Sequence, residues 1–100
     1  MSAYFVIHNR IHNAKKMEEY IPKALESMAP YKPEVLVIEE NSTVVEGTTS
    51  LPRTVVIKFD SREAAMAWYN SPEYSAARPL RLEATEGFMV LVDGFVFPQQ

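Results

Sequence analysis

The chain contains no cysteine and only three glycines. The absence of cysteine excludes disulfides, thiolate catalysis and zinc or iron–sulfur sites built on cysteine. No glycine-rich phosphate loop, no Ser/His/Asp set and no paired carboxylates at defensible positions stand out. The sequence therefore predicts no cofactor. It predicts no metal site either, because His8 and His12 have helical ligand spacing but fall on a strand and the turn after it, where they point in different directions.

The chain also lacks the features that bind membranes and nucleic acids. No segment approaches the roughly 20 apolar residues of a membrane span, and the apolar run near the N-terminus is far shorter than the core of a signal peptide. The net charge is -3 and the isoelectric point is about 5.3, and the ten basic residues are scattered rather than gathered into a phosphate-binding patch. We therefore expect a cytoplasmic protein that binds neither membranes nor nucleic acids.

The composition is that of an ordinary globular protein. Of the 100 residues, 47% are hydrophobic and 23% are charged, so the chain has enough apolar material to fold around a core. A chain of this length can bury one core and rarely two. Residues 1–100 are therefore expected to form a single domain.

The first third of the chain has the pattern of a strand followed by a helix. Ala3 to Ile11 is rich in aromatic and β-branched residues and predicts a strand, in which alternate residues form a more apolar and more deeply buried face. The residues of that face are Phe5, Ile7, Asn9 and Ile11. Asn13 is a good N-cap for a helix whose apolar residues recur at helical spacing as far as Met28. Pro22 lies inside this pattern and is expected to kink or shorten the helix.

Two further strands are predicted in the middle of the chain. Val35 to Glu39 has strand composition, and Thr43 to Glu46 is expected to continue the extended pattern after a break. Thr54 to Phe59 predicts the third strand. An amphipathic helix follows it, and the spacing of Asp60 and Glu63 suggests a capping box with Asp60 as the N-cap.

The last third of the chain is expected to contain a second helix start and a final strand. Residues 70–72, Asn-Ser-Pro, should end the preceding helix and begin another, with Ser71 as N-cap and Pro72 at the first helical position. Tyr74 to Arg78 predicts a short helical piece, which Pro79 should interrupt. Gly87 to Val92 predicts the last strand.

This order is β-α-β-β-α-β, the α+β ferredoxin-like arrangement, in which helices cover one face of a four-stranded antiparallel sheet. The first, third and fourth predicted strands carry bulky apolar residues on both faces; on the first strand, for example, Val6 competes with Ile7. A sheet that is apolar on both faces needs a second layer, and the chain has no element left to supply it. The expected partner is therefore a second copy, in a homodimer with the sheets packed face to face. Phe95 and Phe97 should pack on that partner or across the dimer edge.

The stretch from Phe59 to Tyr74, FDSREAAMAWYNSPEY, closely resembles the DUF1330 family of the dimeric α+β barrel superfamily. The resemblance covers nearly the whole chain, is strongest from Val55 to Tyr74 and in the last strand, and is weak from Glu39 to Pro52. It implies the same fold and the same dimer, but no assigned reaction. Relatives in the wider superfamily include cofactor-free monooxygenases, isomerases and cyclases, yet their Trp/Asn/Arg set has no residue-by-residue match here. The resemblance therefore leaves open whether the chain is an enzyme.

Polar side chains interrupt the apolar faces of the two central strands. Tyr4, His8 and Arg10 share one face of the first strand. Lys58 lies on the corresponding face of the third strand, which is expected to be the neighbour of the first. Such a row predicts a pocket for a small polar or anionic ligand. His8 is the candidate proton carrier, because imidazole titrates near neutral pH. The alternatives are a hydrogen-bonded, structural His8 and a solvated interface rim without a cavity.

Aromatic and basic residues on the helices are further candidates. Trp68 and Tyr74 are expected either to form a wall of this pocket or to pack in the core, where large aromatics dominate small domains. Arg78 and Arg81 have the spacing of a carboxylate clamp, although basic residues near a helix end also suit the helix dipole. Two functions remain: binding or transforming a small organic molecule in a pocket between sheet and helices, or a dimeric binding or regulatory module without catalysis.

Overall fold

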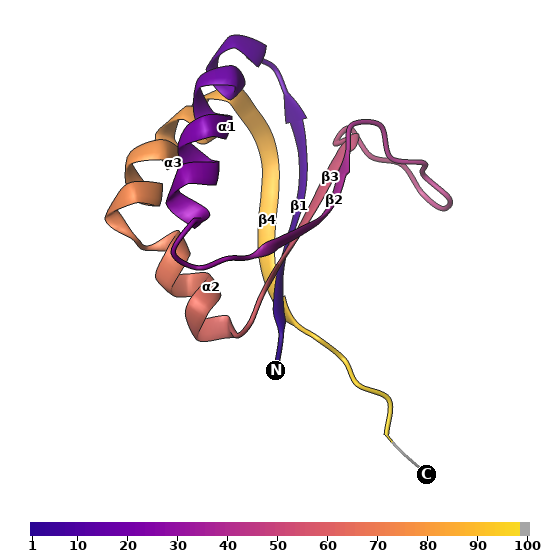
Figure 1. The fold of residues 1–100 in the computed structure, drawn as a ribbon. Helices are drawn as coiled ribbons and strands as arrows, with labels where there is room; N and C mark the ends of the chain where they lie inside the picture. Colours follow the sequence, from indigo (N-terminus) through magenta and orange to yellow (C-terminus); the bar gives the residue numbers. More distant parts are fainter. Residues whose placement is uncertain (99–100) are drawn as a thin grey trace.

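The chain folds into two layers, an antiparallel sheet and a set of helices that cover one of its faces (Figure 1). The computed structural model describes residues 1–98, so Gln99 and Gln100 of the expected 1–100 domain lie outside the described residues. The described elements are β1 (Ala3–Ile11), α1 (Ala14–Met28), β2 (Glu34–Glu39), β3 (Arg53–Phe59), α2 (Arg62–Tyr69), α3 (Pro72–Ala84) and β4 (Thr85–Asp93). The strand order is β2-β3-β1-β4, and all neighbouring pairs in it are antiparallel. The ferredoxin-like fold predicted from the sequence is confirmed.

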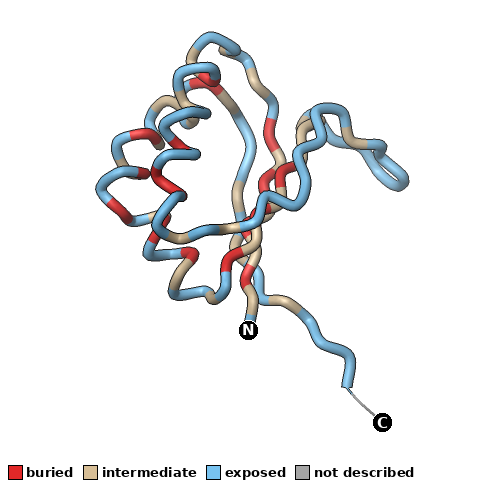
Figure 2. Tube along the Cα trace, in the orientation of Figure 1, coloured by how far each residue is buried: buried red, intermediate tan, exposed pale blue. Residues whose placement is uncertain are grey.

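The core lies between the central strands and the helices. Phe5 of β1 pairs with Ile57 of β3, and Ile7 pairs with Val55, so that these four side chains point toward the helices and are buried. Figure 2 shows the buried positions on the central strands and on the helices, while the segment beyond β4 is mostly exposed. The sequence pattern thus assigned the faces of β1 correctly, with Asn9 as a polar exception on the buried side.

Helix α1 begins where the sequence predicts, and Pro22 does not shorten it. The side chain of Asn13 accepts a hydrogen bond from the backbone N–H of Lys16 at 3.1 Å, which confirms the N-cap. The helix continues through Pro22 to Met28 and is not shortened. A proline inside a helix removes only one backbone donor. Burial of one face of α1 offsets that loss; its buried residues are Met17, Ala24, Ser27 and Met28.

The start of α2 lies one residue later than the capping-box spacing suggests. Ser61, not Asp60, is the N-cap, and its hydroxyl accepts a hydrogen bond from the backbone N–H of Ala64 at 3.0 Å. Ser61 has the extended backbone conformation that an N-cap requires, so its hydroxyl reaches the amide three residues on. The prediction of Asp60 as the cap was therefore wrong.

Helix α3 is longer than the sequence suggests. Ser71 is the N-cap, as predicted, and its hydroxyl accepts from the backbone N–H of Tyr74 at 3.2 Å, with Pro72 at the start of the helix. The predicted interruption at Pro79 was wrong, because α3 continues to Ala84. The buried face of α3 runs along its whole length and outweighs the one hydrogen bond lost at the proline. Its buried residues are Tyr74, Ala77 and Ala84.

The segment between β2 and β3 is a loop that projects away from the sheet (Figure 1). Residues 40–52 form no strand, so the expected extension over Thr43 to Glu46 was wrong. The loop is closed at its base, where the backbone N–H of Ser42 donates to the carbonyl of Pro52 at 2.8 Å. Beyond that point no strand of residues 1–98 pairs with the loop, and Val45 is 88% exposed.

The outer face of the sheet, opposite the helices, carries a row of valines. Val6 of β1 lies between Val56 of β3 and Val90 of β4, and Val37 of β2 pairs with Val56 on the far side. Val37 and Val90 remain 40% and 43% exposed. Beyond β4, Phe95 and Phe97 are also largely exposed, and their segment runs away from the body of the molecule (Figure 1). No element of the described residues covers this outer face.

Candidate functional site

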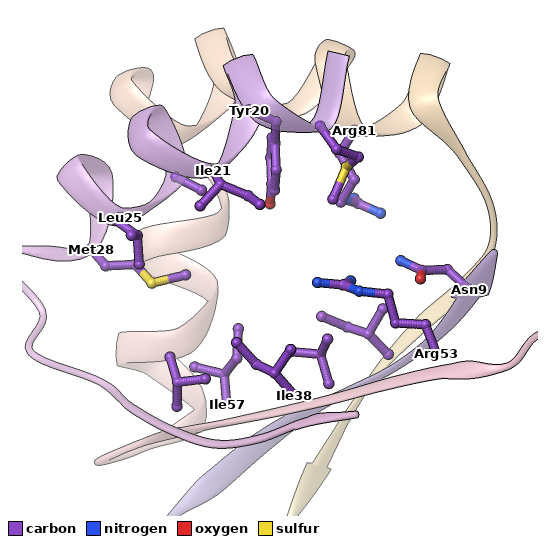
Figure 3. Close-up of a pocket in the computed structure, with 14 residues that line it drawn as sticks. Asn9, Tyr20, Ile21, Leu25, Met28, Ile38, Arg53, Ile57 and Arg81 are labelled. Atoms are coloured by element: carbon purple, nitrogen blue, oxygen red, sulfur yellow. The ribbon is translucent and has the colours of Figure 1, made fainter. Parts of the chain in front are cut away.

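A cavity of about 110 Å³ lies between helix α1 and the inner face of the sheet (Figure 3). Most of its wall is aliphatic, contributed by both layers. Three of the lining residues, Ile21, Leu25 and Ile38, are 43%, 56% and 60% exposed. Because Ile21 and Leu25 belong to α1 and Ile38 to β2, the cavity opens to solvent between that helix and the edge strand.

One end of this cavity is polar, and four side chains from different elements form it. Asn9 of β1 and Arg53 of β3 are directly paired across the sheet, while Tyr20 comes from α1 and Arg81 from α3. Figure 3 shows Asn9 and Arg53 extending into the cavity from the sheet at one end, with Arg81 reaching toward them from the helix side. We call these four residues, Asn9, Tyr20, Arg53 and Arg81, the polar end of the inner pocket.

Asn9 is the most unusual member of the polar end. Its side chain is buried, with the residue only 2% exposed, yet neither the amide oxygen nor the amide nitrogen has a hydrogen-bond partner in the described protein. An unpaired buried polar group costs roughly 1–3 kcal/mol. A core position held for packing alone would be filled better by an aliphatic residue. Both polar atoms of Asn9 are therefore available to a group inside the cavity.

Tyr20 and Arg81 are held in place by Tyr74, which lies behind them. The hydroxyls of Tyr20 and Tyr74 are 2.8 Å apart, and Nε of Arg81 donates to the Tyr74 hydroxyl at 3.2 Å. Burial, reinforced by the neighbouring Tyr74, raises the pKa of Tyr20 far above its ordinary value, so Tyr20 is a neutral hydroxyl. Burial alone would lower the pKa of Arg81, but the phenols of Tyr74 and Tyr20 raise it, so this guanidinium stays charged.

Arg53 supplies the second positive charge. Its Nε lies 3.1 Å from a carboxylate oxygen of Glu40, an ion pair between a side chain that is 11% exposed and one that is 67% exposed. An ion pair with so exposed a partner is weakened by water and salt. The rest of the guanidinium is directed into the cavity (Figure 3). The polar end thus combines two cationic groups, a phenol and an unpaired amide, which together suit an oxygen-rich or anionic group.

The polar row predicted on the sheet lies on its outer face, opposite the helices and the inner pocket. Tyr4 pairs with Lys58, and His8 pairs with Thr54, so the expected neighbours are side by side. They project away from the helices, however, and not into the inner pocket. Arg10 forms an ion pair with Glu86, and Lys58 lies 4.0 Å from Glu34. A ligand role for Tyr4, His8, Arg10 and Lys58 stays a prediction.

His8 belongs to a hydrogen-bond chain on this outer face. Its Nδ1 lies 3.1 Å from the hydroxyl of Thr54, which in turn lies 2.6 Å from the hydroxyl of Ser42 at the base of the projecting loop. The ring of Phe88 lies beside the imidazole, with 5.6 Å between centroids. An open cleft of about 560 Å³ lies between this group and the loop. His8 is thus hydrogen-bonded, as the structural alternative expects, at the edge of a cleft.

Trp68 and Tyr74 lie in the core on the helix side of the sheet. They are 1% and 0% exposed, and their ring centroids are 4.1 Å apart. The indole N–H of Trp68 donates to the hydroxyl of Ser27 at 3.0 Å, which satisfies its one donor. The two aromatics therefore share no pocket with the outer polar row. Neither lines the inner pocket. Tyr74 is connected to it by its hydrogen bonds to Tyr20 and Arg81, which do line it.

The two arginines of α3 have separate environments. Arg78 stacks on Tyr69, with its guanidinium carbon 4.7 Å from the ring centroid, and donates to the Tyr69 carbonyl at 3.2 Å. Only Arg81 of this pair lines the inner pocket. The carboxylate clamp considered from their spacing is therefore not formed by these two residues; Arg81 instead lies across from Arg53 (Figure 3).

Within residues 1–98, no group of three or more His, Asp or Glu side chains is placed to hold a metal ion. No helix in this part of the chain is long and apolar enough to cross a membrane.

The two-layer fold, with a cavity between its helices and its antiparallel sheet, defines a ferredoxin-like α+β protein. Residues 2–95 match DUF1330, a domain of unknown function, and the chain belongs to this family. The resemblance noted in the sequence is thereby confirmed. No curated protein matches the chain significantly.

Several solved structures share the fold. A protein of unknown function from Rhodopseudomonas palustris is 11% identical, with a TM-score of 0.79 over 95% of this chain and 83% of that one. A dimeric ferredoxin-like protein of unknown function from Jannaschia sp. CCS1 is 16% identical, with a TM-score of 0.66 over 96% and 100%. SnoaB, a cofactor-independent oxygenase from Streptomyces nogalater, is 11% identical, with a TM-score of 0.64 over 99% and 98%. At these identities the similarity establishes the fold alone.

Proposed function

We propose that the protein is a homodimer that binds a small organic molecule in the inner pocket, between the sheet and helix α1. The observation that carries this proposal is the unpaired amide of Asn9 at the polar end of an otherwise aliphatic cavity. Small-molecule sites have this character in general: concave, mostly apolar and provided with a few convergent polar groups. The cofactor-independent oxygenase among the similar structures is consistent with a small-molecule role for this fold.

The homodimer is supported by the outer face of the sheet. The row of valines across all the described strands is too apolar and too exposed for a surface that faces water alone. Structures from Jannaschia and from Thermobifida fusca with the same fold are described as dimeric. A second copy would bury this face, and it would leave the inner pocket open, because the pocket mouth lies on the opposite side of the sheet.

The alternative is a dimeric binding or regulatory module without turnover. The observation that favours it is the protonation of Tyr20 and Arg81, two of the residues that line the pocket. The raised pKa values of Tyr20 and Arg81 keep those two groups in their neutral and cationic forms. Such groups bind and orient a ligand, whereas a general base needs a pKa near the working pH. Turnover would then require a substrate that supplies its own reactive group.

A blocked pocket mouth tests the proposal. Leu25→Trp should fill the opening between α1 and β2, because Leu25 lines the pocket and is 56% exposed. Leu82→Trp is the matched control, since Leu82 is 58% exposed on α3 and does not line the pocket. Small organic molecules that raise the melting temperature of the wild type should lose this effect in Leu25→Trp and keep it in Leu82→Trp. Equal responses in both variants would place the site elsewhere.

A further inference from the structure

We infer that the ligand of the inner pocket is an organic carboxylate with an apolar body, whose carboxylate is bound by Asn9, Arg53 and Arg81. This inference rests on the proposed function and names the chemical class of its ligand. It follows from three properties of the pocket: two guanidinium groups with no carboxylate among the described lining residues, an unpaired amide beside them, and an aliphatic wall that leads from this end to the mouth.

The charge at the polar end favours an anion. Arg53 and Arg81 both line the pocket, and among its described lining residues there is no Asp or Glu. Arg53 has a carboxylate partner in Glu40, but this lies on the solvent side and is 67% exposed. Nε of Arg81 donates to the hydroxyl of Tyr74, and within residues 1–98 no carboxylate is among the partners recorded for Arg81. A carboxylate between the two guanidinium groups would gain charge-assisted hydrogen bonds from both sides, and arginine matches its planar geometry.

The amide of Asn9 fits the same ligand. Its side chain is directed toward the guanidinium groups of Arg53 and Arg81 (Figure 3). A carboxylate oxygen placed there would accept from the Asn9 amide N–H, and the amide oxygen would accept from a guanidinium N–H of its cross-strand neighbour Arg53. Both unpaired atoms of Asn9 would then be satisfied. A cationic ligand would instead bring like charges together at this end.

The rest of the cavity selects an apolar body. From the polar end to the mouth the wall is formed by aliphatic side chains and methionines, and the mouth itself is framed by Ile21, Leu25 and Ile38. A hydrocarbon chain or an aromatic ring attached to the carboxylate would replace water against this surface. Small dicarboxylates and sugar acids would place polar groups there without partners, so the pocket should reject them.

The test compares acids with their neutral analogues on the full-length protein. Octanoate and benzoate, each beside the corresponding primary amide and alcohol, are titrated by calorimetry. The acids should bind at least about tenfold more tightly than their neutral analogues, because the neutral forms lose charge-assisted hydrogen bonds. Arg53→Gln and Arg81→Gln should each weaken acid binding by about tenfold or more and leave the neutral analogues little changed. Arg78→Gln is the matched control and should change neither, since Arg78 lies on Tyr69 and outside the pocket.

The outcomes separate this inference from the proposed function. If the neutral analogues, or neutral molecules found in the thermal-shift screen, bind as tightly as the acids and still respond to Leu25→Trp, the pocket is a ligand site and the carboxylate inference is overturned. If neither acids nor neutral molecules bind in a way that Leu25→Trp abolishes, the proposed function falls as well. If circular dichroism shows that Arg81→Gln does not fold, Arg81→Lys replaces it in the binding test. This variant keeps the positive charge but loses the planar guanidinium that matches a carboxylate.

Discussion

The hydroxyl of Tyr20 on α1 lies 2.8 Å from the hydroxyl of Tyr74 on α3. This contact joins the two helices at the polar end of the inner pocket, and Nε of Arg81 donates to the same Tyr74 hydroxyl. Tyr74 is fully buried against Trp68, so its position is fixed by core packing. Through this relationship the core determines where Tyr20 and Arg81 present their polar groups, even though Tyr74 itself does not line the pocket.

Tyr20 should make the protein sensitive to alkaline pH. Its pKa is raised in the folded state by burial and by Tyr74, whereas in the unfolded chain it should have the ordinary value of about 10. A proton held more tightly in the folded state stabilises that state fully below the unfolded pKa, and this stabilisation is lost as the pH rises through the folded pKa. The free energy of unfolding of the wild type should therefore fall above about pH 10.

The measurement is urea unfolding as a function of pH in wild type and in Tyr20→Phe. The variant should show a shallower fall above about pH 10, because it lacks the group that must ionise on unfolding. Tyr31→Phe is the control, since the Tyr31 hydroxyl makes only a long, exposed bond of 3.4 Å to the Ala67 carbonyl, and its pH profile should follow the wild type. Identical profiles for all three proteins would contradict the prediction.

Replacing Asn9 by leucine should stabilise the ligand-free protein while weakening ligand binding. Leucine has the same branched arrangement of side-chain heavy atoms and removes two buried polar atoms that have no partner in the described protein, so the free energy of unfolding should rise by about 1 kcal/mol or more. Chemical unfolding measures this change. Asn41→Leu is the control at an exposed position, where the effect should stay within about 0.5 kcal/mol. A loss of stability in Asn9→Leu would show that Asn9 is paired in the free protein and serves the fold.

The strand pattern and the fold could be predicted from the sequence, because alternation and helix caps are local signals. The faces of β1 and the caps at Asn13 and Ser71 followed from them. The central pairing of β1 with β3 followed from the ferredoxin-like order of the elements. Pro79 was misjudged and Pro22 does not shorten its helix, because whether a helix tolerates proline depends on burial of its other residues, which is a tertiary property.

The inner pocket was harder to predict, because its polar end is assembled from four elements. Asn9 did carry a signal, as a lone amide on the apolar face of its strand. Tyr20 and Arg53 carried none, since a tyrosine on an apolar helix stripe and an arginine at a strand start are both common. Arg81 was considered only together with Arg78, because spacing along one helix is visible in a sequence and proximity across two layers is not.

The outer face predicts a dimer that a single charge should disrupt. Light scattering of the wild type should give about twice the 11.4 kDa mass of the chain. Val90→Glu places a carboxylate on the exposed row of valines, and burying it against a second sheet would be costly, so this variant should be monomeric at micromolar concentration. Leu82→Glu is the control on the helix side, where Leu82 is also exposed, and it should remain dimeric. A wild-type monomer would contradict the dimer outright.

The segment after β4 should contribute to the dimer. Phe95 and Phe97 are 76% and 80% exposed, and their rings pack edge to face on each other with 5.0 Å between centroids. Two exposed phenylalanines are costly in water unless a partner covers them. A chain truncated after Asp93 should therefore have a higher dimer dissociation constant or a lower melting temperature than the wild type. Analytical ultracentrifugation measures the first and calorimetry the second. Unchanged values for both would show that the segment makes no contact that matters.

His8→Ala separates the outer cleft from the inner pocket. The imidazole bonds to Thr54, which also bonds to Ser42 at the base of the loop, so the substitution should leave one hydroxyl with fewer partners and lower the free energy of unfolding by about 1 kcal/mol. Amide hydrogen exchange in residues 40–52 should become faster, because Ser42 connects that loop to the sheet.

Binding in the inner pocket should not change in His8→Ala, because His8 faces the opposite side of the sheet from Asn9 and Arg53. Calorimetry with the same acids, run beside Arg53→Gln, provides the comparison. Loss of binding in His8→Ala with an unchanged free energy of unfolding would return the site to the outer polar row of Tyr4, His8, Arg10 and Lys58. A lower free energy of unfolding with unchanged binding of the acids would show that His8 stabilises the loop and that the ligand binds in the inner pocket.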